Sequence, residues 1–215
     1  MQTGKYLPMP IWFIYGLVLF FVVGWLVATH WRALEKIAAI IYLVALILSF
    51  LAELSSQRLS NSAGRIYKPA QLYMLHVLWG LIVVAPMVEH VVYPGSNSLV
   101  MTAGILFHLA GVALRYSNRE IMQAYFSGLL DIDETQARLT SGTYRVVRHP
   151  RYLGVLLQAA GLVLILGSWY ASVLLVALIA LMIVRIQSEE WFLARTLPDY
   201  HMYKRVTWRL VPGIW

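Results

Sequence analysis

Two short polar clusters contain most of the side chains in this chain that could do chemistry. The first extends from Ser141 to Tyr152, and the second follows a long apolar segment and contains Arg185, Glu189 and Glu190. Arg185 and Glu189 are four positions apart, so they share one face if this segment is helical. Two adjacent carboxylates at a membrane edge are costly unless a cationic group binds them. The pattern therefore favours a binding or catalytic site over the alternative, an interfacial salt bridge at a helix end.

The first cluster has the composition of a ligand pocket at the start of a helix. Pro150 suits the first helical turn, which places His149 on the N-cap side, where outward backbone N–H groups favour an anionic group. The alternative is that basic and aromatic side chains only extend to the lipid headgroups. We prefer that alternative for Arg151, whereas we expect His149 and Tyr152 to line a ligand pocket.

The composition identifies an integral membrane protein that forms a single domain over residues 1–215. Hydrophobic residues make up 60% of the chain and charged residues only 13%, far from the proportions of a soluble domain. The net charge of +7 could indicate nucleic-acid binding. However, the basic residues flank apolar segments, as in membrane proteins, so we expect no nucleic-acid partner. The absence of cysteine excludes disulfides and thiolate chemistry, and we expect no metal site.

Six apolar segments predict an all-α, polytopic transmembrane helix bundle of about six spans. A single helix from Arg151 to Ile186 would be roughly 54 Å long, against a hydrocarbon core of about 30 Å. Gly167 and Ser168 therefore predict a break and a C-terminal helical hairpin, which returns both polar clusters to one membrane face. The predicted spans are Ile11–Ala28, Leu34–Ala52, Gln71–Tyr93, Ser98–Leu114, Arg151–Leu166 and Trp169–Ile186.

The distribution of basic residues predicts the orientation of the bundle. With the N-terminus in the cytoplasm, all of the 17 Lys and Arg residues except Arg32 and Lys36 lie on the cytoplasmic side. Cytoplasmic loops of membrane proteins carry such an excess of basic residues. Both termini and the two polar clusters are therefore predicted to be cytoplasmic.

Residues inside the spans are expected to pack rather than to catalyse. Gly104 and Gly111 allow close helix contact, and ordinary packing is preferred over a dedicated dimer interface. His76, His90 and His108 have no acidic partners at the same depth, so we expect each to hydrogen-bond to a neighbouring helix. The C-terminal tail, residues 191–215, is rich in Trp, Tyr, Lys and Arg. It is predicted to be an interfacial amphipathic segment, a lid over the site, or both.

Four motif blocks follow one another along the second half of the chain. They are Gly142-x-Tyr144-Arg145-x-x-Arg148-His149-Pro150-x-Tyr152-x-Gly154, Arg185-Ile186-x-x-Glu189-Glu190-x-x-Leu193, Tyr200-x-x-Tyr203 and Arg209-Leu210-Val211-Pro212. Their order resembles the isoprenylcysteine carboxyl methyltransferase family, and the related phospholipid methyltransferases share much of the pattern. The resemblance covers about residues 114–212, and the first three spans carry no recognised motif. Residues 98–215 would thus be a methyltransferase-like core, preceded by N-terminal spans over residues 1–97.

The resemblance implies S-adenosylmethionine as the methyl donor and a lipophilic acceptor from the bilayer. Arg185 and Glu189 match the family's catalytic arginine and glutamate. A carboxylate acceptor, which we favour, needs a guanidinium to hold it, whereas an amine acceptor needs Glu189 as a base. The residues that would line the cofactor pocket are Tyr144, His149, Pro150, Tyr152 and Glu190.

Three other functions compete with a carboxyl methyltransferase. The first is an N-methyltransferase acting on a phospholipid or another amine. The second is a sterol-type NADPH-dependent reductase, which has a comparable C-terminal architecture. Its cofactor carries a 2′-phosphate that the pair Glu189 and Glu190 would repel. The third is a non-catalytic scaffold or transporter, which would leave the clustered Arg, His, Tyr and Glu side chains unexplained.

Overall fold

A computed structural model describes residue 24 and residues 37–57, 69–95, 97–117, 142–196 and 200–215. Within these residues the fold is all-α, as predicted, apart from one isolated bridge between two loops. The helices are α3 (Ile37–Gln57), α4 (Pro69–Val92), α5 (Ser98–Ser117), the 3₁₀ helix η2 (Gly142–Arg145), α8 (Pro150–Ile165), α9 (Trp169–Thr196) and α10 (Tyr200–Val206).

Among the described residues, three helical segments are long and apolar enough to cross a membrane, namely Tyr73–Val92, Ser98–Ser117 and Trp169–Arg195. The apolar part of α3, Ile37–Leu51, and helix α8 are shorter. Each of the last five predicted spans thus corresponds to a helix. The first predicted span, Ile11–Ala28, lies outside the described residues except for Gly24.

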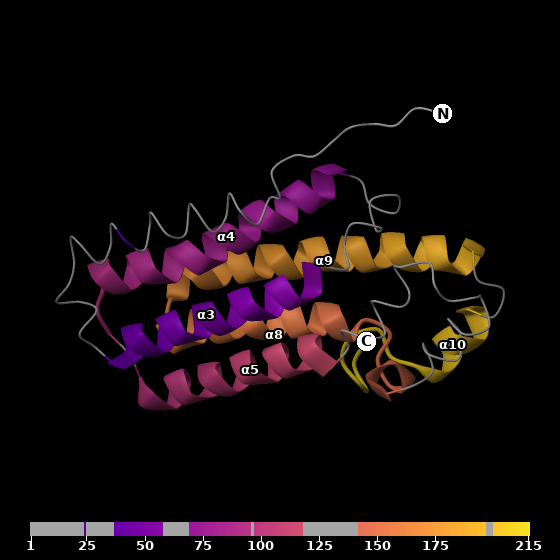
Figure 1. Ribbon diagram of the computed structural model, residues 1–215. Coiled ribbons are helices and arrows are strands. Elements are labelled where there is room, and N and C mark those ends of the chain that lie inside the picture. Colours follow the sequence, from indigo (N-terminus) through magenta and orange to yellow (C-terminus); the bar gives the residue numbers. More distant parts are fainter. Residues whose placement is uncertain (1–23, 25–36, 58–68, 96, 118–141, 197–199) are drawn as a thin grey trace.

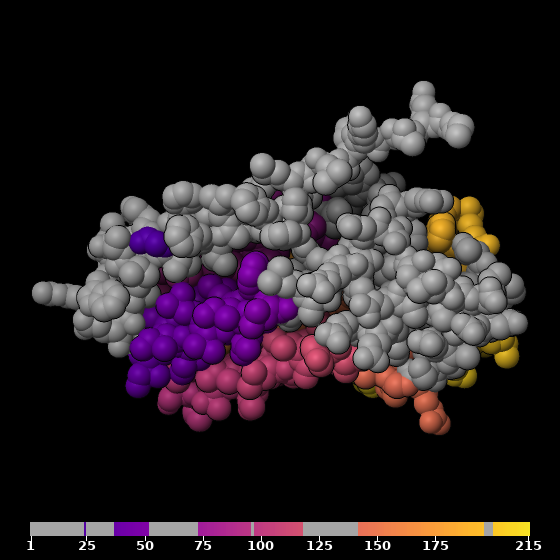
Figure 2. Space-filling view, in the orientation of Figure 1, coloured from indigo at the N-terminus to yellow at the C-terminus, as the bar shows by residue number. Residues whose placement is uncertain are grey.

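Helix α8 occupies the centre of the bundle. It packs along α5 over most of its length and also contacts α3, α4 and α9 (Figure 1). Figure 2 shows α3 and α5 side by side on one face of the molecule. The fully buried Leu162 and Ile165 pack against α3 and α4, and Val163 packs in a second cluster that includes Leu178 of α9. The apolar helices thereby fix the position of the first turn of α8.

Glycines allow the close contact between α5 and α8. A Cβ atom at Gly161 would lie 2.7 Å from the carbonyl oxygen of Gly104, and one at Gly154 would lie 2.9 Å from that of Gly111. No real side chain tolerates such distances to backbone atoms. The prediction that Gly104 and Gly111 serve ordinary packing within the chain is therefore confirmed, since their partners are glycines of α8.

A short buried polar network also joins these helices. The His108 ring nitrogens lie 3.3 Å from Ser49 Oγ and 3.4 Å from the carbonyl oxygen of Gln158. Arg115 Nη1 donates to Gln158 Oε1 at 2.7 Å. The expectation that His108 bonds to neighbouring helices is confirmed, and the network ties the end of α5 to α8.

The predicted hairpin between α8 and α9 is confirmed. Gly167 adopts a φ of +66°, a conformation that glycine reaches without steric cost. The next helix is capped from another element, because the Glu89 carboxylate accepts the backbone N–H groups of Trp169, Tyr170 and Ala171. A carboxylate at a helix N-terminus satisfies otherwise unpaired donors and opposes the helix dipole.

The end of the last predicted span was placed too early. Helix α9 continues ten residues beyond Ile186, to Thr196, so Arg185, Glu189 and Glu190 lie inside a helix rather than at its end. The helix can continue because α8 and the C-terminal residues supply partners for these charges. A helix of 28 residues is about 42 Å long, which exceeds a hydrocarbon core of about 30 Å.

Candidate functional site

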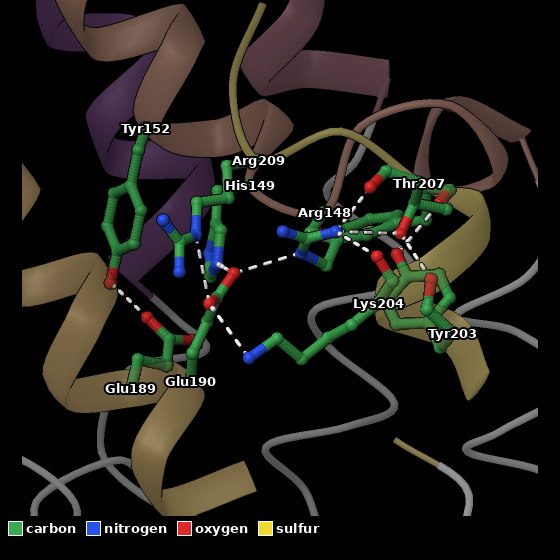
Figure 3. Close-up of polar contacts among 10 residues, drawn as sticks. Arg148, His149, Tyr152, Glu189, Glu190, Tyr203, Lys204, Thr207 and Arg209 are labelled. Carbon is green, nitrogen blue, oxygen red and sulfur yellow. Dashed lines mark hydrogen bonds and ion pairs between the residues drawn. The ribbon is translucent and has the colours of Figure 1, made fainter. Parts of the chain in front are cut away.

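Both polar clusters meet at one end of the bundle, where α8 begins and where the second half of α9 passes it (Figure 1). The C-terminal segment, defined here as residues 200–215, lies at the same end. Figure 3 shows side chains from α8, α9 and this segment pointing toward one another. The hairpin therefore brings the two clusters together, as the sequence predicted.

Backbone hydrogen bonds join the C-terminal segment to the loop before α8. The N–H of Trp208 donates to the carbonyl of Val146 at 2.9 Å, and the N–H of Arg148 donates to the carbonyl of Trp208 at 2.7 Å. His149 N–H donates to the carbonyl of Arg209 at 3.1 Å. These bonds surround the parallel bridge between Val147 and Trp208. The segment is thus bound to the site by main-chain contacts and not only by side chains.

Tyr203 adds a side-chain bond to the same junction. Its hydroxyl donates to the carbonyl oxygen of Tyr144 at 2.8 Å. Burial raises the pKa of Tyr203, and burial followed by the charge of Glu190 raises the pKa of Tyr200. Both phenols therefore stay protonated at neutral pH, and Tyr203 remains a hydrogen-bond donor.

Glu190 is the centre of a group that we term the Glu190 cluster. Its side chain is 3% exposed, and four nitrogen-bearing side chains from two other parts of the chain surround it (Figure 3). The distances to its carboxylate oxygens are 2.9 Å from Arg148 Nε, 3.0 Å from Arg209 Nε, 3.5 Å from His149 Nε2 and 3.6 Å from Lys204 Nζ. One buried carboxylate thus holds α9, the loop before α8 and the C-terminal segment together.

Arg148 links this cluster to the C-terminal segment. Besides Glu190, its guanidinium donates from Nη1 to the carbonyl oxygen of Lys204 at 3.0 Å and to that of Thr207. A planar guanidinium has several donors in fixed directions, and here they bind both a carboxylate and the backbone at the end of α10. Arg148 therefore shapes the site even though the sequence-based assignment of pocket residues omitted it.

A second group, which we term the Tyr152 chain, consists of Arg185, Tyr152 and Glu189. Arg185 Nε donates to the hydroxyl of Tyr152 at 2.9 Å, and that hydroxyl donates to Glu189 Oε2 at 2.6 Å. The side chain of Arg185 is buried, and Glu189 is half-buried. Tyr152 thereby fixes the orientation of a cation and an anion that are four residues apart on α9.

His149 lies between the two groups. Its ring stacks on Tyr152, with centroids 5.6 Å apart and planes inclined by 19°. His149 occupies the N-cap position of α8, and Pro150 follows in the first turn, as the sequence predicted. The buried His149 Nε2 lies 3.5 Å from a carboxylate oxygen of Glu190, at the outer limit of a hydrogen bond. A polar atom in this state can bind a ligand.

All seven residues singled out in the sequence lie at this end of the bundle. Tyr144 is buried, and its carbonyl accepts the Tyr203 hydroxyl. Pro150 is fully buried. The sequence analysis did not assign Arg148, Lys204, Thr207 and Arg209 to the site. Arg148 and Arg209 do stand in the motif blocks, which was the available signal. Nothing in the sequence pairs Lys204 with Glu190 or Thr207 with Arg148.

Comparison with known families adds chemistry to this geometry. Residues 99–199 match the family model described as phospholipid methyltransferase. This part of the chain is therefore similar to phospholipid methyltransferases. The protein is an S-adenosylmethionine-dependent membrane methyltransferase, so a reductase or an inert scaffold is no longer a competing function. No curated protein and no solved structure matches the chain.

The match spans just under half of the 215 residues and includes most of the Glu190 cluster and all of the Tyr152 chain. The C-terminal segment begins after it. The side chains present suit a cationic methyl donor in kind, because the half-buried Glu189 and the faces of His149 and Tyr152 attract a sulfonium. His149 Nε2 offers a further polar contact.

Proposed function

We propose that this enzyme methylates a carboxylate of a lipophilic acceptor, as the isoprenylcysteine carboxyl methyltransferases do. The observation that supports this acceptor is the buried guanidinium of Arg185, whose Nε is fixed by the Tyr152 hydroxyl at 2.9 Å. A fixed, planar guanidinium binds a carboxylate through two parallel hydrogen bonds. Its location in the second half of α9 suits an acceptor whose apolar part stays in the bilayer.

Each member of the Tyr152 chain has a distinct part in the proposed reaction. When bound, S-adenosylmethionine supplies an electrophilic methyl group. Arg185 holds the acceptor carboxylate, and Tyr152 keeps the guanidinium in one orientation. Glu189 favours the cationic donor electrostatically. The acceptor oxygen gains the methyl group, the donor leaves as its neutral thioether, and no proton is released. Correct positioning of the two reactants is then the main contribution of the protein.

We further propose that Tyr144, His149, Pro150, Tyr152 and Glu190 form the cofactor pocket, with Glu190 acting indirectly. Its carboxylate is already engaged by Arg148 and Arg209. It would therefore support the pocket by holding the C-terminal segment against α8, rather than by facing the sulfonium. His149 and Tyr152 would contact the donor directly.

A second acceptor class, the amine of a phospholipid head group, is supported by the family match. An ammonium group must lose a proton before it can accept a methyl group. Glu189 lies one turn of α9 after Arg185 and can act as the base. It already accepts a hydrogen bond from Tyr152. In that reaction Arg185 would bind the lipid phosphate in place of a carboxylate.

An assay with labelled S-adenosylmethionine can separate the two acceptors. The purified enzyme would be given a prenylated cysteine with a free carboxylate, the matching carboxamide, or phosphatidylethanolamine. We expect transfer only to the carboxylate, and alkali should release the label as volatile methanol because the product is an ester. Alkali-stable label in phosphatidylethanolamine would overturn the carboxylate proposal and establish the amine reaction.

The proposed orientation places this site in the cytoplasm. The chain has no native cysteine, so single cysteines can report on each end of the bundle. Trp169 and Met202 are 84% and 63% exposed, and they lie at opposite ends of the bundle. In intact cells, W169C should react with a membrane-impermeant maleimide and M202C should not. The reverse pattern would place the site outside.

A further inference from the structure

A cavity of about 370 Å³ lies beside the Glu190 cluster, on the C-terminal segment. The cavity is separate from the proposed reaction centre, because none of the residues of the Tyr152 chain lines it. Its walls are strongly basic and aromatic. They include four cationic side chains and two indoles, from Arg148, Lys204, Arg205, Arg209, Trp208 and Trp215.

Counted over the described residues, the cavity carries an excess of positive charge. Glu190 contacts Arg148, Lys204 and Arg209, but a single carboxylate cannot balance three cations. Arg205 is exposed, and no ion pair of Arg205 occurs within the described residues. The Arg209 guanidinium also lies 5.1 Å from the centre of the Trp215 ring. A concave site with surplus charge and several guanidinium donors is complementary to a phosphate group.

The surroundings of the cavity indicate that this phosphate belongs to a membrane lipid. Val206, Trp208 and Ile214 are 76%, 46% and 80% exposed, so large apolar side chains adjoin the basic walls. Basic residues combined with exposed aromatic and aliphatic side chains are typical of segments that lie in the membrane interface. The length of α9, about 42 Å, also carries one end of that helix to headgroup depth.

We propose that this cavity binds the head group of an anionic phospholipid, which anchors the C-terminal segment to the membrane surface. The lipid phosphate lies against Arg205 and Lys204, and the exposed apolar side chains enter the interface beside it. Arg148 and Arg209 contact both the cavity and Glu190. Lipid binding therefore stabilises the same segment that Glu190 holds against the start of α8, whichever acceptor the enzyme methylates.

Native mass spectrometry of the full chain in a non-ionic detergent would test this proposal. The probes are phosphatidylglycerol and phosphatidylcholine with identical acyl chains, together with inorganic phosphate. We expect wild type to bind phosphatidylglycerol selectively. Each basic residue near a membrane surface changes affinity roughly fivefold, so R205Q should bind this lipid roughly fivefold more weakly. Raising the salt concentration should reduce the selectivity.

R195Q provides the matched control. Arg195 lies on α9 with its guanidinium 3.6 Å from the Trp191 ring centre, and it does not line the cavity. The control should keep wild-type affinity for phosphatidylglycerol. Equal weakening in R195Q and R205Q would show a diffuse charge effect and would overturn the proposal. Equal binding of both lipids, or inorganic phosphate competing at the concentration of the lipid, would also overturn it.

A saturating amount of the demethylated cofactor distinguishes this site from the cofactor pocket. Under the proposal it leaves phosphatidylglycerol binding unchanged, whereas displacement of the lipid would assign the cavity to the cofactor and refute a lipid site. Calorimetric titration of S-adenosylmethionine tests the proposed function separately. Failure of the lipid site therefore leaves the methyltransferase assignment intact, and the two results can be told apart.

Discussion

The Glu190 cluster and the Tyr152 chain start from adjacent residues of α9, yet they differ in charge balance and exposure. Glu190 is buried among Arg148, Arg209, Lys204 and His149. The neighbouring Glu189 is half-buried and receives one hydrogen bond, from the Tyr152 hydroxyl, among the contacts described above. The first carboxylate is enclosed by groups of its own chain, whereas the second keeps part of its surface accessible.

Under our proposal, this difference separates a structural role from a chemical one. A buried carboxylate that satisfies several cations cannot lose its charge without leaving those cations unpaired. A half-buried carboxylate at the end of a hydrogen-bond chain can respond to a bound ligand at lower cost. We therefore expect Glu190 to stabilise the fold and Glu189 to serve the reaction. Substitutions at the two positions should distinguish these roles.

The largest effect is expected from E190Q. Glutamine keeps the shape but leaves Arg148 and Arg209 without a counter-charge, and breaking a buried ion pair costs about 3–5 kcal/mol. The variant should melt at a lower temperature in detergent, and proteases should cut its C-terminal segment more rapidly. Weaker binding of S-adenosylmethionine should accompany this loss.

E189Q is the matched control for that experiment, because it makes the same change one residue earlier. It should retain most of the wild-type melting temperature. The proposed structural role of Glu190 would be contradicted if E190Q melted at the wild-type temperature and lost only cofactor affinity. Glu190 would then act on the sulfonium directly, as the sequence alone suggested.

The next largest effect is expected from R185K, on turnover rather than on stability. Lysine keeps the charge but lacks the planar pair of donors that grips a carboxylate. Loss of one charge-assisted hydrogen bond of about 1.5–3 kcal/mol would slow the reaction roughly ten- to hundredfold. Calorimetry should show unchanged binding of S-adenosylmethionine. Wild-type turnover in R185K would argue against a carboxylate acceptor.

The sequence predicted the helices and the meeting of the two clusters because those features depend on local signals. The apolar lengths indicated the helices, and Gly167 with Ser168 indicated the hairpin between α8 and α9. The motif blocks then pointed to residues that do lie together, including His149 at the N-cap of α8. The family match to phospholipid methyltransferases confirmed the enzyme class but not the carboxyl-methylating family or the acceptor.

The proposed difference in role between Glu189 and Glu190 was not predictable from the sequence. It depends on partners such as Lys204 and Arg209 that are distant along the chain, and spacing alone cannot pair them with a particular carboxylate. The length of α9 was missed for the same reason. Charged residues normally mark the end of a span, but here tertiary contacts satisfy them and the helix continues to Thr196.

A smaller effect is expected from Y152F, which removes the hydroxyl that joins Arg185 to Glu189. The stack of the ring on His149 should persist, because phenylalanine has the same ring. Loss of this hydroxyl should reduce kcat roughly fivefold, equivalent to about 1 kcal/mol, with little change in melting temperature. Steady-state kinetics with the true acceptor would measure it. A large loss of stability with normal kcat would make Tyr152 part of the scaffold instead.

The smallest effect is expected from Y203F, which makes the same chemical change in the structural half of the site. The Tyr203 hydroxyl donates to the carbonyl of Tyr144 at 2.8 Å, and an uncharged hydrogen bond of this kind contributes about 0.5–1.5 kcal/mol. The backbone bonds between Trp208, Val146 and Arg148 remain, so the C-terminal segment should stay bound. Its protease sensitivity should rise only slightly, without a change in kcat.

Y152F and Y203F together test whether the two halves of the site are separable. Each substitution deletes one phenolic oxygen, so any difference between them reflects the surroundings and not the chemistry removed. Protease sensitivity and kcat should change in different variants, the first in Y203F and the second in Y152F. If both measurements changed together in both variants, the Glu190 cluster and the Tyr152 chain would form one cooperative unit. Glu190 would then affect kcat through the same hydrogen-bond network as Glu189.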